Sequence, residues 1–284
     1  MNRVKANYYN PLAKKEELSK GYFDEEHYPL EPLHYSIDYT FINSILESMN
    51  RYRGTSKITG WGVLSNKFFK NGWFGAISAI TTYSIIRKVK PISIIEIGSG
   101  YSTLVMLKAI DDGSLKTEIN CISPEFPKDI VDLSESRKDL NLYKGNVREI
   151  LYPKQALSWI KDIKAELGKV IVFIDSTHCF RAGGELNYLL FSLLEKFPSG
   201  TLIHFHDIFI PYEYPKEWVL KKKRAWNEQY VLYAFLYDNL RFHTVFPQRF
   251  VEEKKKLELK DILGDKLTSF PYNYYSESFW IEVL

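Results

Sequence analysis

The feature that most constrains the fold of this chain is an apolar run at residues 92–97 that leads directly into Gly98-Ser99-Gly100. The run is rich in β-branched residues, which predicts a strand buried on both faces of a parallel sheet. Pro91 lies just before it and ends the helical pattern of residues 80–89, because proline disfavours α geometry in the residue that precedes it. Ser102 can cap a helix that follows the glycines. The segment therefore predicts a strand, a tight loop and a helix in succession.

The rest of the chain repeats this alternation of strands and helices. Helices are expected at 103–110, 185–197 and 228–240, and further strands at 118–122, 141–143, 170–175, 201–206, 242–246 and 278–283. Such alternation predicts an α/β fold with a doubly wound, mostly parallel sheet and right-handed crossovers. Sheets of this kind bind ligands at the carboxyl ends of their strands, where the strand order reverses.

Three of the expected strands end in ionisable residues. Glu96 ends the first strand, Asp175 the fourth, and His206-Asp207 the fifth. In the doubly wound order the first and fourth strands are neighbours at the point of reversal. We therefore expect these side chains to share one crevice.

Length and composition favour one elaborated domain, since 284 residues with 45% hydrophobic content can bury a large core. Residues 1–70 are aromatic and irregular, with a short amphipathic piece at 38–49, and are expected to form an N-terminal cap on a main domain at 71–284. We expect this cap and the Pro- and Tyr-rich stretch 210–229 to cover the crevice.

Composition also limits location and partners. No apolar stretch approaches the roughly 20 residues of a membrane-spanning helix, and the N-terminus lacks the apolar core of a secretory signal, so a cytoplasmic protein is expected. Its two cysteines, Cys121 and Cys179, are expected to be reduced thiols. The net charge of +3 is too small for a nucleic-acid-binding surface and favours a small-molecule partner, while a homo-oligomer stays open.

The glycine loop indicates which cofactor this crevice binds. Thr103 stands where a dinucleotide-binding loop would have its third glycine, which disfavours a dehydrogenase. Glu96 would repel an anionic pyrophosphate but would favour a cationic cofactor. S-adenosylmethionine carries an ammonium and a sulfonium and no phosphate. The loop therefore predicts a site for S-adenosylmethionine.

Several motifs resemble the small-molecule methyltransferase family that includes macrocin O-methyltransferase. They are residues 94–103, residues 173–178 (Phe-Ile-Asp-Ser-Thr-His), residues 204–209 (His-Phe-His-Asp-Ile-Phe), and the later segments 211–218 and 226–230. The resemblance implies a Rossmann-like methyltransferase fold with a seven-stranded sheet, whose last strand, 279–283, is antiparallel.

The same resemblance implies a binding site for the methyl donor. Relatives usually have an acidic residue at the end of the second strand to hold the ribose, whereas this chain has Ser123 there, with Glu125 nearby as a replacement. The expected donor-binding residues are Glu96, Gly98, Ser99, Gly100, Ser102, Thr103, Ser123, Glu125, Asn146 and Asp175.

Methyl transfer to oxygen needs a hydroxyl that loses its proton, either to a base or with the help of a cation. His178 is the candidate base, because an imidazole with its ordinary pKa of about 6.5 is suited to accept a proton. By resemblance to metal-dependent O-methyltransferases, Asp175, His206 and Asp207 would bind a divalent ion, with magnesium as the expected metal. His204 lies deeper on the same strand face as His206 and is interpreted as a core or supporting residue.

Some neighbouring residues have two interpretations. Asp207 can instead cap the turn after the fifth strand, and the run 221–224 is interpreted mainly as a solvated basic face. Tyr212, Tyr214 and Trp218 can pack in the interior or form a wall on which a sugar stacks.

The predicted function is S-adenosylmethionine-dependent O-methylation of a small hydroxylated molecule, such as a sugar or a glycosylated metabolite. Two alternatives stay open. One is an iron-dependent hydroxylase on the methyltransferase fold, and the other is a non-catalytic cofactor-binding protein. Methylation of nucleic acid is disfavoured, since the chain lacks a basic stripe and an Asn/Asp-Pro-Pro-Tyr type of motif.

Overall fold

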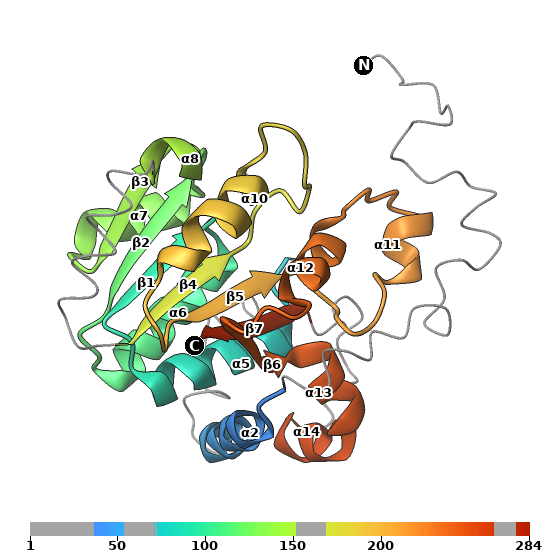
Figure 1. The fold of residues 1–284 in the computed structure, drawn as a ribbon. Helices are drawn as coiled ribbons and strands as arrows, with labels where there is room; N and C mark the ends of the chain where they lie inside the picture. The colour runs from blue at the N-terminus through green and yellow to red at the C-terminus, as the bar shows by residue number, and fades with distance from the viewer. Residues whose placement is uncertain (1–36, 54–70, 72, 152–168, 264–276) are drawn as a thin grey trace.

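The computed structural model describes residues 37–53, 71, 73–151, 169–263 and 277–284 (Figure 1). These residues form a seven-stranded sheet in the order β3-β2-β1-β4-β5-β7-β6. The strands are β1 (Ser93–Ile97), β2 (Glu118–Ser123), β3 (Leu140–Lys144), β4 (Val170–Ile174), β5 (Leu202–His206), β6 (Phe242–Pro247) and β7 (Ser278–Val283). The doubly wound α/β fold expected from the sequence is therefore confirmed, with each strand within a few residues of its expected position.

Strand direction also agrees with expectation. The pairs among β1 to β5 are parallel, whereas β7 runs antiparallel to both β5 and β6. The sheet order reverses between β1 and β4, where Ile97 pairs with Ile174. Because β1 to β5 point the same way, their carboxyl ends meet at one edge of the sheet. That edge, called the carboxyl edge below, carries the candidate site.

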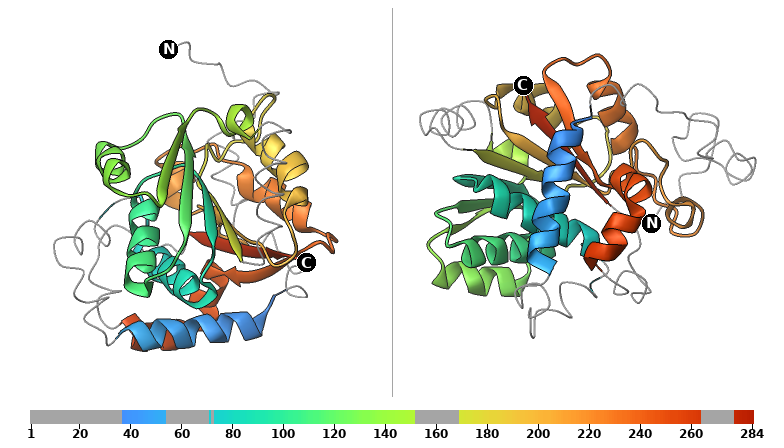
Figure 2. Two further views of the ribbon diagram at one scale, coloured as in Figure 1. Left: turned by 90° about the vertical axis from the view of Figure 1, so that its left-hand side faces the viewer. Right: turned by 90° about the horizontal axis from the view of Figure 1, so that it is seen from below.

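Helices cover both faces of the sheet (Figure 2). One face packs against α2 (Tyr39–Arg53), α5 (Ala76–Val89), α6 (Tyr101–Gly113), α7 (Lys128–Ser136), α13 (Gln248–Lys254) and α14 (Lys256–Leu263). The other face packs against α8 (Val147–Ile150), α10 (Glu185–Tyr188) and α12 (Glu228–Leu236). A further short helix, α11 (Lys216–Leu220), belongs to a small separate cluster.

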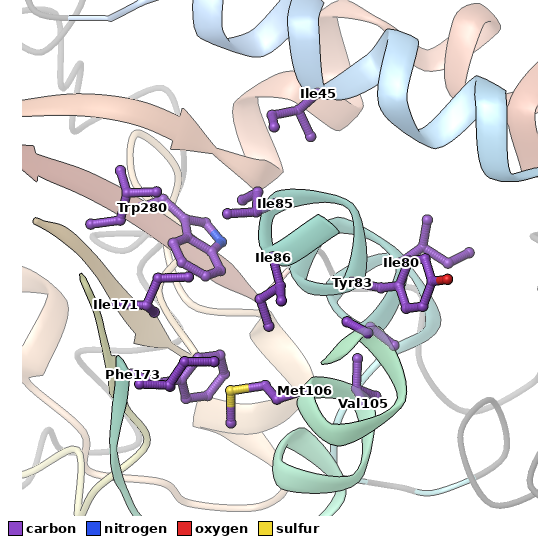
Figure 3. Close-up of a cluster of buried hydrophobic side chains, with 14 of the residues drawn as sticks. Ile45, Ile80, Tyr83, Ile85, Ile86, Val105, Met106, Ile171, Phe173 and Trp280 are labelled. Atoms are coloured by element: carbon purple, nitrogen blue, oxygen red, sulfur yellow. The ribbon is translucent and has the colours of Figure 1, made fainter. Parts of the chain in front are cut away.

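The strand residues alternate between these two cores, as a two-residue period requires. In β4, Ile171 and Phe173 face the first core and Val172 and Ile174 face the second. Every residue of β4 is buried, which explains why its sequence is a continuous apolar run rather than an alternating one. Figure 3 shows Phe173 and Ile171 packed with Trp280 against the helices of the first face.

Helix boundaries are where the sequence expectations were least accurate. The helix expected at 185–197 is broken into α10, a π-helical turn at Leu189–Leu193 and a 3₁₀ turn at Leu194–Lys196. The helix expected at 80–89 begins earlier, at Ala76. The short helices α7, α8 and α11 and the late pair α13 and α14 were not expected at all. Local periodicity is weak in such short elements, because tertiary packing rather than propensity stabilises them.

Most of the expected N-terminal cap, residues 1–36 and 54–70, lies outside the described residues. Its described part, α2, begins where Ile37 bridges to Thr244 of β6 and packs on α5 and α14. These contacts place α2 on the helical layer of the first face. The division into a cap at 1–70 and a main domain at 71–284 stays a prediction.

Among the helices that the structure describes, none is long and apolar enough to cross a membrane.

Candidate functional site

The loop after β1 begins with a glycine that the neighbouring strand requires. Gly98 has a φ of +100°, and a Cβ added to it would lie 2.3 Å from the carbonyl oxygen of Asp175. The backbone of Asp175 donates a hydrogen bond to Ile97 O at 2.8 Å, which holds the ends of β1 and β4 together. Gly98 is therefore needed for the close approach of two strands.

Gly100 has a different environment. A Cβ added there would meet no atom of the described residues within 4 Å. The backbone N–H of Gly100 donates to Thr103 Oγ1 at 3.0 Å, and Ser99 Oγ lies 3.0 Å from the same oxygen. The loop thus leaves open space at Gly100, directly before the first turn of α6. This is the part of the predicted donor site that has room for a ligand.

Glu96 lies within the protein rather than at its surface. Its side chain is fully buried and accepts hydrogen bonds from Ser102 Oγ and Thr103 Oγ1, both at 2.6 Å, and from Cys121 Sγ at 3.1 Å. Burial raises the pKa of Glu96 to about 7, although these three hydrogen bonds oppose the rise. Glu96 therefore ties the start of α6 to β1, and the hydroxyls of Ser102 and Thr103 serve the same purpose.

Three further expected donor-binding residues, Ser123, Glu125 and Asn146, lie at or just after the ends of β2 and β3, also on the carboxyl edge. Ser123 Oγ donates to the backbone oxygen of Glu125 at 2.6 Å, so this hydroxyl shapes the turn after β2. The Glu125 side chain is exposed. Asn146 caps α8, where its side chain accepts a hydrogen bond from Arg148 N at 2.9 Å.

His178 stands at the centre of a buried polar cluster. Its Nδ1 lies 2.9 Å from Glu228 Oε2, and its Nε2 lies 3.5 Å from Asp175 Oδ1 and 3.4 Å from Asp207 Oδ2. Its backbone has a φ of 56°, in the left-handed region that few residues other than glycine adopt. The structure therefore brings together the expected base and two of the three expected metal ligands, with Glu228 as an additional member.

The charges of this cluster change what His178 can do. Burial alone would lower the pKa of His178, but Asp175, Glu228 and Asp207 outweigh that effect and hold the pKa well above its ordinary value. This direction favours the imidazolium form, and Nε2 can accept a proton only when the ring is neutral.

The carboxylates around His178 differ in the direction in which their pKa values are shifted. Burial raises the pKa of Asp207 and of Glu228. Burial also tends to raise the pKa of Asp175, but the charges of His206 and His178 lower it overall. Of the two carboxylates beside Nε2, Asp207 is the one whose pKa is raised.

His206 belongs to a second group of possible metal ligands. In the part of the chain that the structure describes, His206, Asp207 and Glu277 offer ligand atoms that all lie within 4.8 Å of one another. His206 Nε2 lies 3.7 Å from both Asp207 Oδ1 and Glu277 Oε2, and 3.2 Å from the carbonyl oxygen of Trp73. Asp175, an expected ligand, is not in this group, whereas Glu277, which was not expected, is.

His204 lies deeper in β5, as expected. It is fully buried, stacks on Phe173 with ring centroids 3.7 Å apart, and pairs through Nε2 with Ser278 Oγ at 2.9 Å. Burial, with the nearby charge of His206, holds its pKa well below the ordinary value. A neutral, stacked imidazole is consistent with the predicted core or supporting role.

The stretch 210–229 lies against the cluster, as expected for a cover. Trp226 packs on His178 with ring centroids 4.2 Å apart, and the guanidinium of Arg224 lies 4.0 Å from the Trp218 ring centroid and 4.1 Å from that of Trp226. Tyr214 and Trp218 are buried, which assigns them to packing rather than to an open stacking wall. The three lysines of the basic run 221–224 are exposed, whereas Arg224 is half-buried.

Sequence reasoning missed Glu228, Glu277 and Trp226 as members of the site. Glu228 lies 50 positions from the histidine it contacts, and Glu277 directly precedes the last strand. The motif around Trp226 to Tyr230 was noticed as a family signature without a role. An acidic residue at the start of a helix is favoured by the helix dipole. The position of Glu228 in the sequence therefore did not indicate a functional role.

The sequence was also compared with families of known proteins. Residues 95–208, which contain β1 to β5 and the segment around His178, match the family model of a methyltransferase domain. No curated protein matches the chain.

Likeness to solved structures is remote. A CmcI structure with Mg and SAM aligns at 10% identity and a TM-score of 0.37, over 60% of this chain and 64% of that chain, so this chain spans less than two thirds of its length. The SAH-bound Podospora anserina methyltransferase PaMTH1 aligns at 14% identity and a TM-score of 0.43, over 84% and 88% of the two chains. The plantazolicin methyltransferase BamL, in complex with a triazolic desmethylPZN analog and SAH, aligns at 15% identity and a TM-score of 0.43, over 86% and 99%.

The sheet order agrees with the family match, which shows that residues 95–208 are similar to a methyltransferase domain.

Proposed function

We propose that the protein transfers a methyl group from S-adenosylmethionine to a hydroxyl of a small molecule, with the donor at the Gly98 to Gly100 loop. One observation carries the proposal. The open space at Gly100 and the cluster around His178 follow the ends of adjacent strands, β1 and β4, which are joined by the hydrogen bond from Asp175 N to Ile97 O. A donor and an acceptor bound at these two places would be neighbours, as in-line methyl transfer requires.

The donor side leaves room for a ligand at Gly100. Gly100 leaves a space that a Cβ would fill, and the loop is fixed by the hydrogen bonds of Glu96, Ser102 and Thr103. Such a preformed loop allows close approach of a ligand to the backbone. When bound here, the donor would supply an activated methyl group, and the loop residues would hold it.

On the acceptor side, His178 is proposed as the group through which the hydroxyl proton leaves. Its Nε2 lies between Asp175 Oδ1 and Asp207 Oδ2. In the neutral ring that keeps its hydrogen on Nδ1, beside Glu228, Nε2 is the nitrogen without a proton. Nε2 can then accept the proton of the attacking hydroxyl.

A divalent ion fits the neighbouring group of ligands. Glu277 is buried, and its Oε2 has no hydrogen-bond partner among the described residues, although it lies in the group with His206 and Asp207. A buried carboxylate oxygen without a hydrogen bond is costly, and a bound cation would offset that cost. When bound, such an ion would make an acceptor hydroxyl more acidic. One imidazole with two carboxylates differs from the two-histidine, one-carboxylate set of non-haem iron oxygenases, so methyl transfer is favoured over hydroxylation.

The acceptor is proposed to be a sugar or a glycosylated metabolite, in line with the resemblance to macrocin O-methyltransferase. Trp73 suits this class, because its carbonyl contacts His206 at the carboxyl edge while 74% of the residue is exposed. An exposed indole can stack on the apolar face of a sugar ring.

The test is an assay of donor turnover against a panel of hydroxylated sugars, glycosides and phenols. Release of the demethylated donor with one acceptor class would support the proposal. Tight donor binding without turnover on any acceptor would instead favour a non-catalytic cofactor-binding protein.

A further inference from the structure

Three consecutive residues at the start of α12 hold His178 from three directions. The Trp226 ring packs against the imidazole at an interplanar angle of 39°. The backbone N–H of Asn227 donates to His178 O at 3.2 Å. Glu228 Oε2 lies 2.9 Å from His178 Nδ1. Ring, backbone and ring nitrogen are thus each held by a different residue.

The backbone beyond His178 is also held by the start of α12. Asn227 Oδ1 accepts a hydrogen bond from Phe180 N at 2.6 Å, and Asn227 Nδ2 donates to Phe180 O at 3.2 Å. These contacts support a residue whose φ of 56° is unfavourable by itself. The left-handed conformation of His178 therefore depends on a segment about fifty positions away.

Burial of the Glu228 carboxylate costs free energy, which a purely structural contact would not justify. Glu228 is 1% exposed, and its Oε1 has no hydrogen-bond partner among the residues that the structure describes. A buried carboxylate is usually no more stabilising than an apolar side chain of similar size. Packing alone would therefore favour an apolar residue at position 228. A carboxylate differs from an apolar side chain here in that it can contact His178 Nδ1.

We propose that Glu228 is a positioning residue, which orients the imidazole of His178 so that Nε2 faces the acceptor. When Nδ1–H donates to Glu228, the ring is fixed with Nε2 directed to Asp175 and Asp207. Trp226 and Asn227 fix the plane of the ring and the backbone that carries it. This inference rests on the proposed function in that His178 handles the acceptor proton.

The contact itself can be tested without any turnover. In protein labelled with ¹⁵N-histidine, an imidazole N–H bonded to a buried carboxylate gives a downfield proton signal, and His178→Ala identifies the signal of His178. We expect Glu228→Ala to abolish this signal. Glu282→Ala is the matched control, because Glu282 lies on β7 and pairs with Lys169 at 3.3 Å. A His178 signal unchanged in Glu228→Ala would overturn the proposal.

Kinetic measurements then distinguish a positioning role of Glu228 from a role in packing alone. Loss of a residue that orients a functional histidine typically costs about 10- to 100-fold in activity. We expect Glu228→Ala to lower kcat by about this factor while the affinity for S-adenosylmethionine stays unchanged. Glu228→Gln, which is nearly isosteric and can still accept from Nδ1–H, should recover part of kcat and also serves if the alanine variant does not fold.

An unchanged kcat in both Glu228 variants would overturn the proposal even if the signal were lost. A wild-type protein that shows the Glu228-dependent signal but turns over no acceptor would count against the proposed function instead.

Discussion

Gly98 and Asp175 are in such close contact that a Cβ on Gly98 would stand 2.3 Å from the Asp175 carbonyl oxygen. The two residues follow the ends of β1 and β4, so this contact is where the donor loop meets the segment that carries His178. Gly98 therefore allows the close approach of the two strands, whereas Gly100 leaves space for a ligand. Substitutions at the two positions should have different effects.

At Gly98, we expect substitution to destabilise the fold. Gly98→Ala places a side chain at a φ of +100° and against backbone, and the conformational strain alone costs about 1–3 kcal/mol. The free energy of unfolding in urea should fall by at least this amount. A variant as stable as the wild type would contradict the close contact.

At Gly100, we expect substitution to remove the donor and to leave the fold intact. Gly100→Ala and Gly100→Val add one and three carbons to a space that described residues do not fill. Calorimetric titration with S-adenosylmethionine should show weakened binding for alanine and none for valine, with a native circular dichroism spectrum in both. Wild-type affinity in Gly100→Val would place the donor elsewhere.

Glu96 should make stability depend on pH. Its pKa of about 7 in the folded protein lies above the ordinary value of 4.5, so the folded state favours the protonated form. The resulting stability is fully present below pH 4.5 and is lost as pH rises through 7, by about 3 kcal/mol at most. Glu96→Gln should flatten this fall, measured by urea unfolding at pH 5 and pH 8. Equal slopes in the two proteins would mean that Glu96 keeps an ordinary pKa.

The metal group can be tested by thermal unfolding with added magnesium or manganese. An ion that binds only the folded protein raises its stability, by about 2.7 kcal/mol at a concentration 100 times the Kd. We expect the Tm of the wild type to rise, and that of Glu277→Gln to rise much less. Glu282→Gln is the control. If Asp175→Asn, rather than Glu277→Gln, abolished the effect, the ligand set expected from the sequence would be preferred.

For catalysis, we expect His178→Ala to lower turnover by about 10²- to 10⁴-fold with little change in donor affinity. His243→Ala is a matched control, because His243 lies on β6 and has Asp38 as its ionic neighbour at 3.9 Å. A fully active His178→Ala enzyme would shift the role of proton acceptor to another member of the cluster.

The sequence was sufficient for the parts of the protein that depend on local pattern. The apolar runs at residues 92–97, 170–175 and 201–206 predicted buried parallel strands, and Asp175, His206 and Asp207 lie at one edge of the sheet. The reason is physical: a strand buried on both faces is mostly apolar, and parallel strands end on the same side. The glycine loop and the antiparallel last strand followed from motif and resemblance.

Tertiary structure alone decided which side chains meet. His178 obtains its partner Glu228 from α12, and His206 is joined by Glu277 from the residue before β7. No periodicity links positions so far apart, because their contact depends on strand order and on the paths of the intervening segments. The pKa of His178 is raised by Asp175, three positions away, and also by Glu228 and Asp207, which only the fold brings close. Its direction therefore could not be derived from the local sequence alone.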